Sequence, residues 1–272
     1  VGVIDSKKFE SIQACNLADG LIFQSGLRVE TDCQTCNYTQ LRMNGLSGGY
    51  SQVLINGRAI FSPLASLYGM EQMPVNMIDR VEVIRGGGSA LYGSSAVGGV
   101  VNVITKNPSV NDYSVGFGYN NINSSSDDII LYGNMSIVDS SKRSGSTFFF
   151  NSRDRMWYDH NGDNYSELPL LESKSFGTSL FFTPAKGHEL DVSMGIFHEY
   201  RYGGEMVYGA PHLAMQAEER VHDLFLGNID YQRNFEDGKS SFVTYLAFQS
   251  TDRSHYTGIR PDIGFDDQHI LN

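Results

Sequence analysis

The second half of the chain contains side chains that can bind a metal or a metal chelate. Imidazole, phenol and thioether groups are ligands of haem iron and of other transition metals. Histidines recur there, in several cases near tyrosine or methionine, and most fall where long loops are expected: His160, His198, His212, His222 and His255. We single out His160 and His212 as candidate haem ligands. Solvated histidines without any ligand are the simpler alternative at each position.

The stretch best suited to ligand contact is residues 201–208. Its sequence is Arg-Tyr-Gly-Gly-Glu-Met-Val-Tyr, which combines a cation, two aromatic rings, a thioether and two glycines. We expect it to lie in a long loop over residues 199–222. The mixture suits a flat, partly apolar ligand. The candidate contacts are Arg201, Tyr202, Met206, Tyr208 and His212.

The remaining polar residues do not form a catalytic arrangement. Carboxylates occur at Asp159, Asp163 and Glu205, but their spacing indicates no acid–base pair. A glycine-rich segment at 86–99 follows an expected strand. No Gly-Lys-Ser/Thr comes after it, and its spacing is not that of a dinucleotide fold. We therefore expect neither an enzyme nor a nucleotide site.

The cysteines leave several interpretations open. Cys33 and Cys36, separated by two residues, could be metal ligands, a redox pair or a small disulfide. A closed zinc site needs four ligands, and the chain has no second such pair. Cys15 lies in a segment with near-helical apolar spacing, where we expect a buried thiol.

The composition excludes further classes. Hydrophobic residues make up 40% of the 272 residues, which is enough for a packed core. The net charge of −11 argues against a nucleic-acid partner, because phosphate binding needs clustered Lys and Arg. The chain has no apolar run of about 18 residues, so we expect no transmembrane helix. Membrane-spanning strands leave a weaker pattern, segments of about ten residues with alternating polarity.

Two parts of the chain must position these residues, and their patterns differ. Residues 1–108 predict a small α+β domain with one or two short helices over 8–23. Strands are expected at 52–58, 80–85 and 100–105, and Asn-Gly at 56–57 predicts a hairpin turn.

After Pro108 the sequence predicts about seven antiparallel strands with no helix between them. Apolar residues at 129, 131, 135 and 137 share one face of such a strand, and polar residues share the other. The expected strands lie near 113–119, 129–137, 145–153, 173–183, 190–196, 223–234 and 240–251.

The connections between these strands alternate in length. Short ones are expected at 140–144, 184–187 and 236–239, and long ones at 154–172 and 199–222. Short turns at one rim and long loops at the other are typical of an outer-membrane barrel. A soluble β-sandwich is the alternative, although sandwiches rarely separate loop lengths so regularly.

The segment over residues 78–105 resembles the end of the plug domain of TonB-dependent receptors. The similarity lies in Glu-Val-Ile-Arg-Gly at 82–86, Ala-Leu-Tyr-Gly at 90–93 and Gly-Val-Val-Asn-Val-Ile-Thr at 99–105. Two upstream stretches, 40–45 and 53–58, resemble further plug motifs. Residues 33–36 with 61–77 look like the Bacteroidetes branch, which includes haem and cobalamin receptors. The energy-coupling box of the family is not identifiable.

The resemblance implies a fold, a location and partners. The fold is a transmembrane antiparallel β-barrel of about 22 strands with an N-terminal α+β plug. Residues 1–108 are then the plug, and residues 109–272 begin the barrel in a Gram-negative outer membrane. About seven strands cannot close around the plug, so we expect roughly 15 more. The implied partners are the lipid bilayer, the TonB–ExbB–ExbD complex of the inner membrane and a surface lipoprotein.

The resemblance also implies site residues and a function. The oxidising periplasm favours a local disulfide between Cys33 and Cys36. Plug loops facing outward would place a binding floor at Tyr50, Arg58, Phe61 and Tyr68. We expect active import of a scarce metal chelate: haem, a ferric siderophore or cobalamin. The iron or cobalt belongs to the cargo, so no intrinsic cofactor is expected. Import of a glycan or peptide together with the lipoprotein is the alternative.

Overall fold

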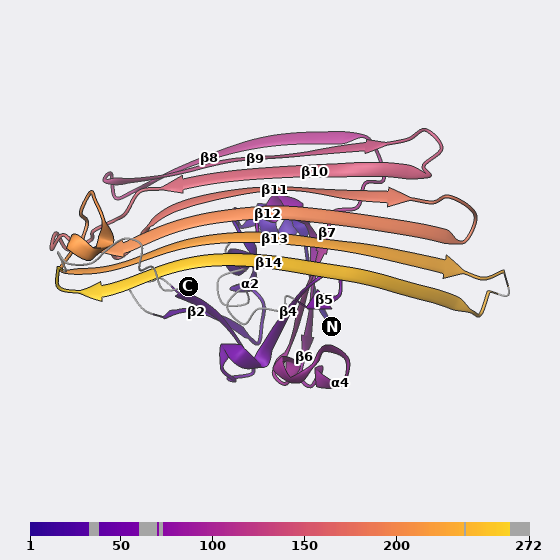
Figure 1. Ribbon diagram of the computed structural model, residues 1–272, viewed down its shortest axis with the longest axis horizontal. Coiled ribbons are helices and arrows are strands. Elements are labelled where there is room, and N and C mark those ends of the chain that lie inside the picture. Colours follow the sequence, from indigo (N-terminus) through magenta and orange to yellow (C-terminus); the bar gives the residue numbers. More distant parts are fainter. Residues whose placement is uncertain (33–37, 60–69, 71–72, 237, 262–272) are drawn as a thin grey trace.

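The computed structural model describes residues 1–32, 38–59, 70, 73–236 and 238–261. Seven long strands form one curved sheet, and a smaller α+β domain lies against one side of it (Figure 1). We call this sheet the wall. None of the described helices has the length and apolar character needed to cross a membrane.

The N-terminal domain begins with two short helices, as predicted. Helix α1 (Ser6–Ser11) starts where the Asp5 carboxylate accepts a hydrogen bond from the Lys8 N–H. Helix α2 (Leu17–Leu21) starts at a capping box, in which the side chains of Asn16 and Asp19 bind each other's backbone N–H groups. Such caps satisfy amides that a short helix leaves unpaired.

A five-stranded sheet forms the centre of this domain, in the order β1-β6-β7-β4-β5. Strands β4 and β7 run parallel, and the other neighbours are antiparallel. A separate hairpin pairs β2 with β3. The bounds are β1 (Gly2–Asp5), β2 (Leu27–Asp32), β3 (Tyr38–Met43), β4 (Ser51–Ile55), β5 (Arg58–Ala59), β6 (Ile78–Arg85) and β7 (Gly99–Thr105).

The predicted Asn-Gly turn is present between β4 and β5. Asn56 and Gly57 have φ values of 49° and 77°, as a two-residue hairpin turn requires. Short helices fill other connections of the domain: η1 (Gly48–Tyr50), η2 (Val75–Met77), α4 (Ser89–Tyr92) and η3 (Ser94–Ala96).

The wall confirms the seven predicted antiparallel strands, each paired with its neighbours in sequence. The first sheet ends at Thr105, and the wall begins at Asp112. Its strands are β8 (Asp112–Ile122), β9 (Ser126–Val138), β10 (Ser144–Arg155), β11 (Leu170–Phe182), β12 (His188–Gly204), β13 (Gln216–Asn234) and β14 (Ser241–Ile259).

The inner face of the wall packs on the N-terminal domain. Phe149, Phe197 and Leu224 of the wall belong to the same hydrophobic core as Phe9 and Val81 of that domain. The opposite face exposes large apolar side chains, including the predicted stripe on β9 at Ile129, Leu131, Met135 and Ile137. A barrel strand that contacts lipid on one side shows this alternation.

The short connections lie together at one end of the wall and the long ones at the other (Figure 1). The predicted long loop over 199–222 is wrong in its bounds. Strand β12 continues to Gly204 and β13 begins at Gln216, so the loop is 205–215, with a short helix η4 (Pro211–Leu213). Charged residues on the inner face of both strands hid the alternation there.

Several wall glycines face an aromatic ring on the adjacent strand. A Cβ built on Gly116 would lie 2.1 Å from Tyr132, and one on Gly227 would lie 2.1 Å from Phe248. Both rings belong to the register partners of these glycines. Gly133 with Phe150, Gly145 with Phe181 and Gly177 with Phe149 repeat the arrangement. Each glycine leaves the space that its partner ring occupies.

Candidate functional site

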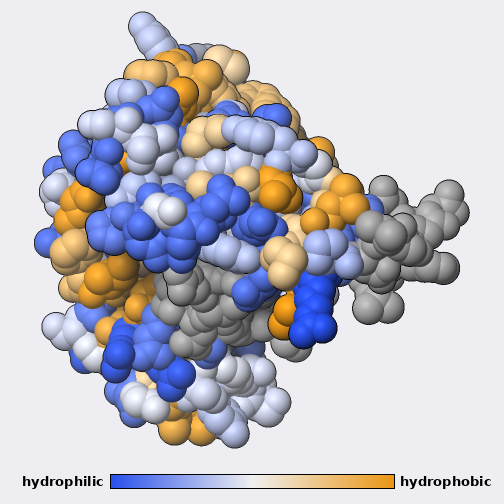
Figure 2. All heavy atoms as spheres, turned by 90° about the vertical axis from the view of Figure 1, so that its left-hand side faces the viewer, coloured by the Kyte–Doolittle hydropathy of each residue, from blue (hydrophilic) through white to orange (hydrophobic). Residues whose placement is uncertain are grey.

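The long-loop end of the wall contains most of the candidate ligand-binding residues. Viewed from this end, the surface is mainly hydrophilic and is interrupted by several hydrophobic patches (Figure 2). Arg201 and Tyr202 are both in β12, not in a loop. Because successive side chains of a strand point to opposite faces, these two residues do not contribute to one surface.

The inner face near this end carries a band of charged residues, which we call the inner charged belt. Antiparallel register places its members on adjacent levels of β9 and β10 on one side of β11, and of β12, β13 and β14 on the other. Arg201 pairs with Glu199 at 3.2 Å, and Arg220 pairs with Glu218 at 3.0 Å. The belt consists of Asp128, Arg153, Arg155, Glu199, Arg201, Glu218, Arg220, His222, Arg253 and His255.

Most of the belt is buried. The exposed fractions of Arg201, Arg220 and His222 are 3%, 2% and 0%. Burial of so many charges is costly unless each is paired. The belt carries five guanidinium groups against three carboxylates, whereas the whole chain has a net charge of −11. Cationic groups are therefore concentrated on the inner side of the wall.

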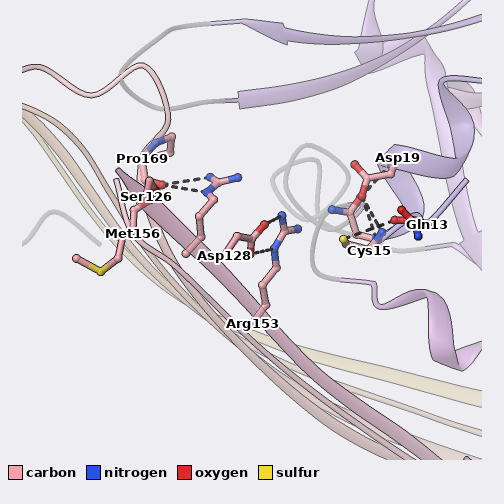
Figure 3. A network of polar contacts seen from close by, with 10 residues as sticks. Gln13, Cys15, Asp19, Ser126, Asp128, Arg153, Met156 and Pro169 are labelled. Carbon is pink, nitrogen blue, oxygen red and sulfur yellow. Dashed lines mark hydrogen bonds and ion pairs between the residues drawn. The ribbon is translucent and has the colours of Figure 1, made fainter. Parts of the chain in front are cut away.

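One belt pair faces the N-terminal domain directly. Arg153 donates two hydrogen bonds to Asp128, at 2.9 and 2.7 Å. Figure 3 shows this pair on the wall, opposite Cys15 and Asp19 of the N-terminal domain. Bidentate pairs of this kind fix both side chains in one orientation.

Cys15 differs from its predicted setting. It lies between α1 and α2 and is half-buried, whereas a buried thiol within a helix was expected. The reason is that Asn16 begins a new helix and so interrupts the apolar spacing. Burial raises the pKa of the Cys15 thiol, and the nearby Arg153 guanidinium offsets this only in part.

An aromatic cluster lies on the other face of the wall at the same end. The Trp157 ring lies 5.9 Å from that of Tyr202 and 5.0 Å from that of Tyr208. The Tyr202 hydroxyl donates to the Glu205 carbonyl at 2.9 Å, and Tyr208 is 87% exposed. We call these three residues the rim aromatic cluster. Tyr202 and Tyr208 are thus brought together, but away from the inner face.

The loop 156–169 is organised around Asp159. Its carboxylate accepts hydrogen bonds from the N–H groups of Gly162, Asn164 and Asn161, at 2.7, 2.8 and 3.1 Å. Desolvation raises the pKa of Asp159, but these hydrogen bonds outweigh it and hold the pKa below its usual value. Carboxylate oxygens of Asp159, Asp163 and Glu167 lie within 4.8 Å of one another, a spacing that could hold a cation.

The other candidates of the long-loop end occupy separate positions. His160 contacts the Tyr158 hydroxyl through Nδ1 at 2.9 Å. The Met206 N–H donates to the Asn164 carbonyl at 2.8 Å and so joins the two long loops. His212 lies in η4. The assignment of His160 and His212 as haem ligands stays a prediction.

The predicted binding floor is described only in part. Tyr50 is in η1 and is 50% exposed. Arg58 lies near the short-turn end, where its side chain reaches Asp230 on β13. Phe61 and Tyr68 lie outside the described residues, as do Cys33 and Cys36.

The inner charged belt was missed by the sequence analysis, although a signal was present. Charged or ionisable residues occur at every second position at 199 and 201 and again at 218, 220 and 222, although Glu219 interrupts the second run. That period of two is the mark of a strand with one polar face. The alternation was read as loop sequence because its buried side is polar.

Comparison with known proteins agrees with this architecture. Residues 1–100 match the family model described as TonB-dependent Receptor Plug Domain. A vitamin B12 transporter of Photobacterium profundum is 34% identical over 105 residues, covering 39% of this chain and 17% of the relative. An iron-regulated outer membrane virulence protein of Vibrio cholerae is 34% identical over 113 residues, with coverages of 39% and 17%.

Solved structures extend the similarity of fold to the wall. A mutant of the ferric enterobactin receptor of Pseudomonas aeruginosa gives a TM-score of 0.73 at 14% identity, covering 93% of this chain and 40% of that structure. The ferric-catecholate import receptor Fiu of E. coli gives 0.68 at 12% identity, with coverages of 94% and 39%. The vitamin B12 transporter and the virulence protein are each matched over only about a sixth of their own length.

Proposed function

We propose that the chain is part of a TonB-dependent receptor of the outer membrane, whose plug-domain family model matches residues 1–100, and that the whole protein imports a metal chelate. The N-terminal domain is the plug, and the seven-stranded wall is part of the barrel. The short turns then face the periplasm, and the long loops face the outside.

The observation that carries this proposal is the shared core of plug and wall. Phe149, Phe197 and Leu224 pack with plug residues on the inner side of the barrel. Cargo that enters at the long-loop end therefore meets a packed domain and cannot pass unless the plug rearranges. A transporter closed by a packed plug needs an external source of energy to move the plug, and it needs no catalytic group of its own.

The energy would come from the inner membrane. We propose the TonB–ExbB–ExbD complex as the partner that acts on the plug. Relatives named for vitamin B12 and ferric enterobactin support cobalt and iron chelates as the class of cargo. Haem belongs to the same chemical group and is tested with them. The metal is cargo, so the protein itself holds no resident cofactor in this scheme.

Two sets of residues are available for cargo at the outer end. The long loops offer Met206, His212 and His160, and Tyr50 of the plug stays a predicted contact. The inner charged belt lies below them on the wall.

The test is an equilibrium titration of the intact, purified receptor with three probes: haem, cyanocobalamin and a ferric siderophore. Haem binding is followed by its absorption spectrum, and the others by quenching of intrinsic fluorescence. We expect one probe to bind, and uptake of that probe by cells to stop when the inner-membrane complex is inactivated. Binding of none of the three, with growth that depends instead on a glycan, would contradict the proposal.

A further inference from the structure

Near the short-turn end of the wall, one arginine of the plug reaches two wall strands. Arg58 is the first residue of β5, the outermost strand of the plug sheet on that side. Its Nη2 atom donates to Asp230 of β13. The guanidinium carbon also lies 3.6 Å from the centre of the Tyr245 ring on β14. A carboxylate beside an aromatic face is a favourable seat for a guanidinium group.

Asp230 is not the only carboxylate that the wall places near the Arg58 guanidinium group. Asp191 on β12 is the register partner of Asp230, and Glu189 lies two residues away on the same inner face. Like charges directly opposite each other on a sheet repel. The Arg58 guanidinium offsets this repulsion, so the wall favours the state in which the arginine is seated.

The plug presents Arg58 from a rigid turn. The Asn56 amide group donates to Thr105 Oγ1 at 2.9 Å, and the Gly57 N–H donates to Asn102 Oδ1 at 2.8 Å. Both acceptors belong to β7, the central strand of the plug sheet. A displacement of the sheet therefore moves the arginine with it.

Separating Arg58 from Asp230 requires less free energy than separating a buried pair of the belt. The Arg58 and Asp230 side chains are 26% and 23% exposed, whereas Arg201 and Glu199 are 3% and 1% exposed. Water can replace the lost contacts of a partly exposed pair, but not those of a buried one. A cavity of about 80 Å³ beside Arg58, lined in part by Met77, Phe149 and Leu226, leaves room for movement.

We propose that Arg58, seated on Asp230 and Tyr245, is a releasable latch that fastens the plug sheet to the barrel wall at its periplasmic end. The inference rests on the proposed function only in treating the plug as the part that moves. The latch keeps the barrel closed at rest, and its release is a step of plug rearrangement. Arg58 is thus a positioning residue and not a contact for cargo at the outer end.

The test uses the intact receptor in liposomes loaded with a hydrophilic dye, whose leakage needs neither cargo nor an energy source. We expect Arg58→Gln and Asp230→Asn each to increase leakage about tenfold, the effect of one lost charge-assisted hydrogen bond on an opening equilibrium. The matched control is Arg233→Gln. It removes the same charge as Arg58→Gln, but from β13, the wall strand that carries Asp230, and the Arg233 side chain packs on Phe235. Its leakage should equal that of the unchanged receptor.

A pair of reversed charges separates a latch from a general loss of stability. Arg58→Asp combined with Asp230→Arg should restore low leakage, while each single change should not. Receptors are compared only where circular dichroism and thermal unfolding show an intact barrel. If a variant does not fold, Arg58→Lys, which keeps the charge and loses the planar contact, gives an intermediate leakage. Leakage of Arg58→Gln equal to the Arg233→Gln control would overturn the latch, whatever the receptor binds.

Discussion

Cys15 is a residue whose chemistry follows from its surroundings. Burial raises the pKa of its thiol. Only the thiolate reacts with alkylating agents, so a raised pKa leaves little reactive form near neutral pH. We expect iodoacetamide to modify Cys15 slowly, with a rate that levels off only at a higher pH than that of an ordinary thiol.

This prediction is checked in a Cys33→Ser, Cys36→Ser background, where Cys15 is the remaining thiol. The control is the same protein in denaturant, whose reaction rate should level off at lower pH. Because the thiol is an acid with a raised pKa in the fold, its contribution to stability is present below the unfolded pKa and decreases as pH rises above it. Equal pH profiles for folded and unfolded protein would contradict the effect of burial.

Asp159 is a second residue with a definite pH dependence. Its pKa is lowered in the fold, so its contribution to loop order is present above the unfolded pKa and is lost as pH falls through the lowered value. Asp159→Asn removes the charged acceptor of three backbone N–H groups. We expect lower protection factors for the Gly162 and Asn164 amides in this variant at neutral pH. The same loss of protection is expected in the unchanged protein under strong acid. Asp163→Asn is the control.

At the scale of elements, the Asp128–Arg153 pair joins β9 to β10. The Asp128 and Arg153 side chains are 7% and 16% exposed, so removing one partner leaves a charge in a buried position. We expect Arg153→Met to lower the free energy of unfolding by about 3–5 kcal/mol. The double variant Asp128→Leu, Arg153→Met should be less destabilised than the single one. Additive losses in chemical denaturation would show that the two groups do not interact.

The sequence allowed the wall strands to be predicted wherever an apolar outer face alternates with polar or small residues. Strand β9 is an example, because Ile129, Leu131, Met135 and Ile137 alternate with polar residues. The prediction failed for the outer ends of β12 and β13, where Glu199, Arg201, Arg220 and His222 face inward. Alternation of polarity cannot show a strand when one face packs charged residues against another domain.

The site could be predicted to a smaller extent than the fold. Residue types made Arg201, Tyr202 and Tyr208 candidates for ligand contact, but did not show that Arg201 and Tyr202 belong to different faces. The Arg58–Asp230 contact joins residues 172 apart in sequence. It depends on how the plug docks on the wall, and no local pattern carries that information.

At the scale of the whole molecule, the wall is an open sheet within the described residues. Strands β8 and β14 each pair on one side and leave the other edge without a neighbour there. Exposed edges associate with other strands. We expect residues 1–272 produced alone in detergent to form mixed oligomers by light scattering, whereas a chain extended to a closed barrel should be monomeric. A stable monomer of residues 1–272 would contradict this.

The glycine–aromatic pairs of the wall have a consequence for how this sequence can change during evolution. Gly116 and Tyr132, or Gly227 and Phe248, occupy one shared space between adjacent strands. Gain of a side chain at the glycine is tolerated only if the ring becomes smaller, and loss of the ring leaves a gap that a larger residue at the glycine can fill. Such positions should covary among homologous barrels even where overall identity is low. Pairs of columns that exchange small for aromatic would then mark strand register directly from an alignment.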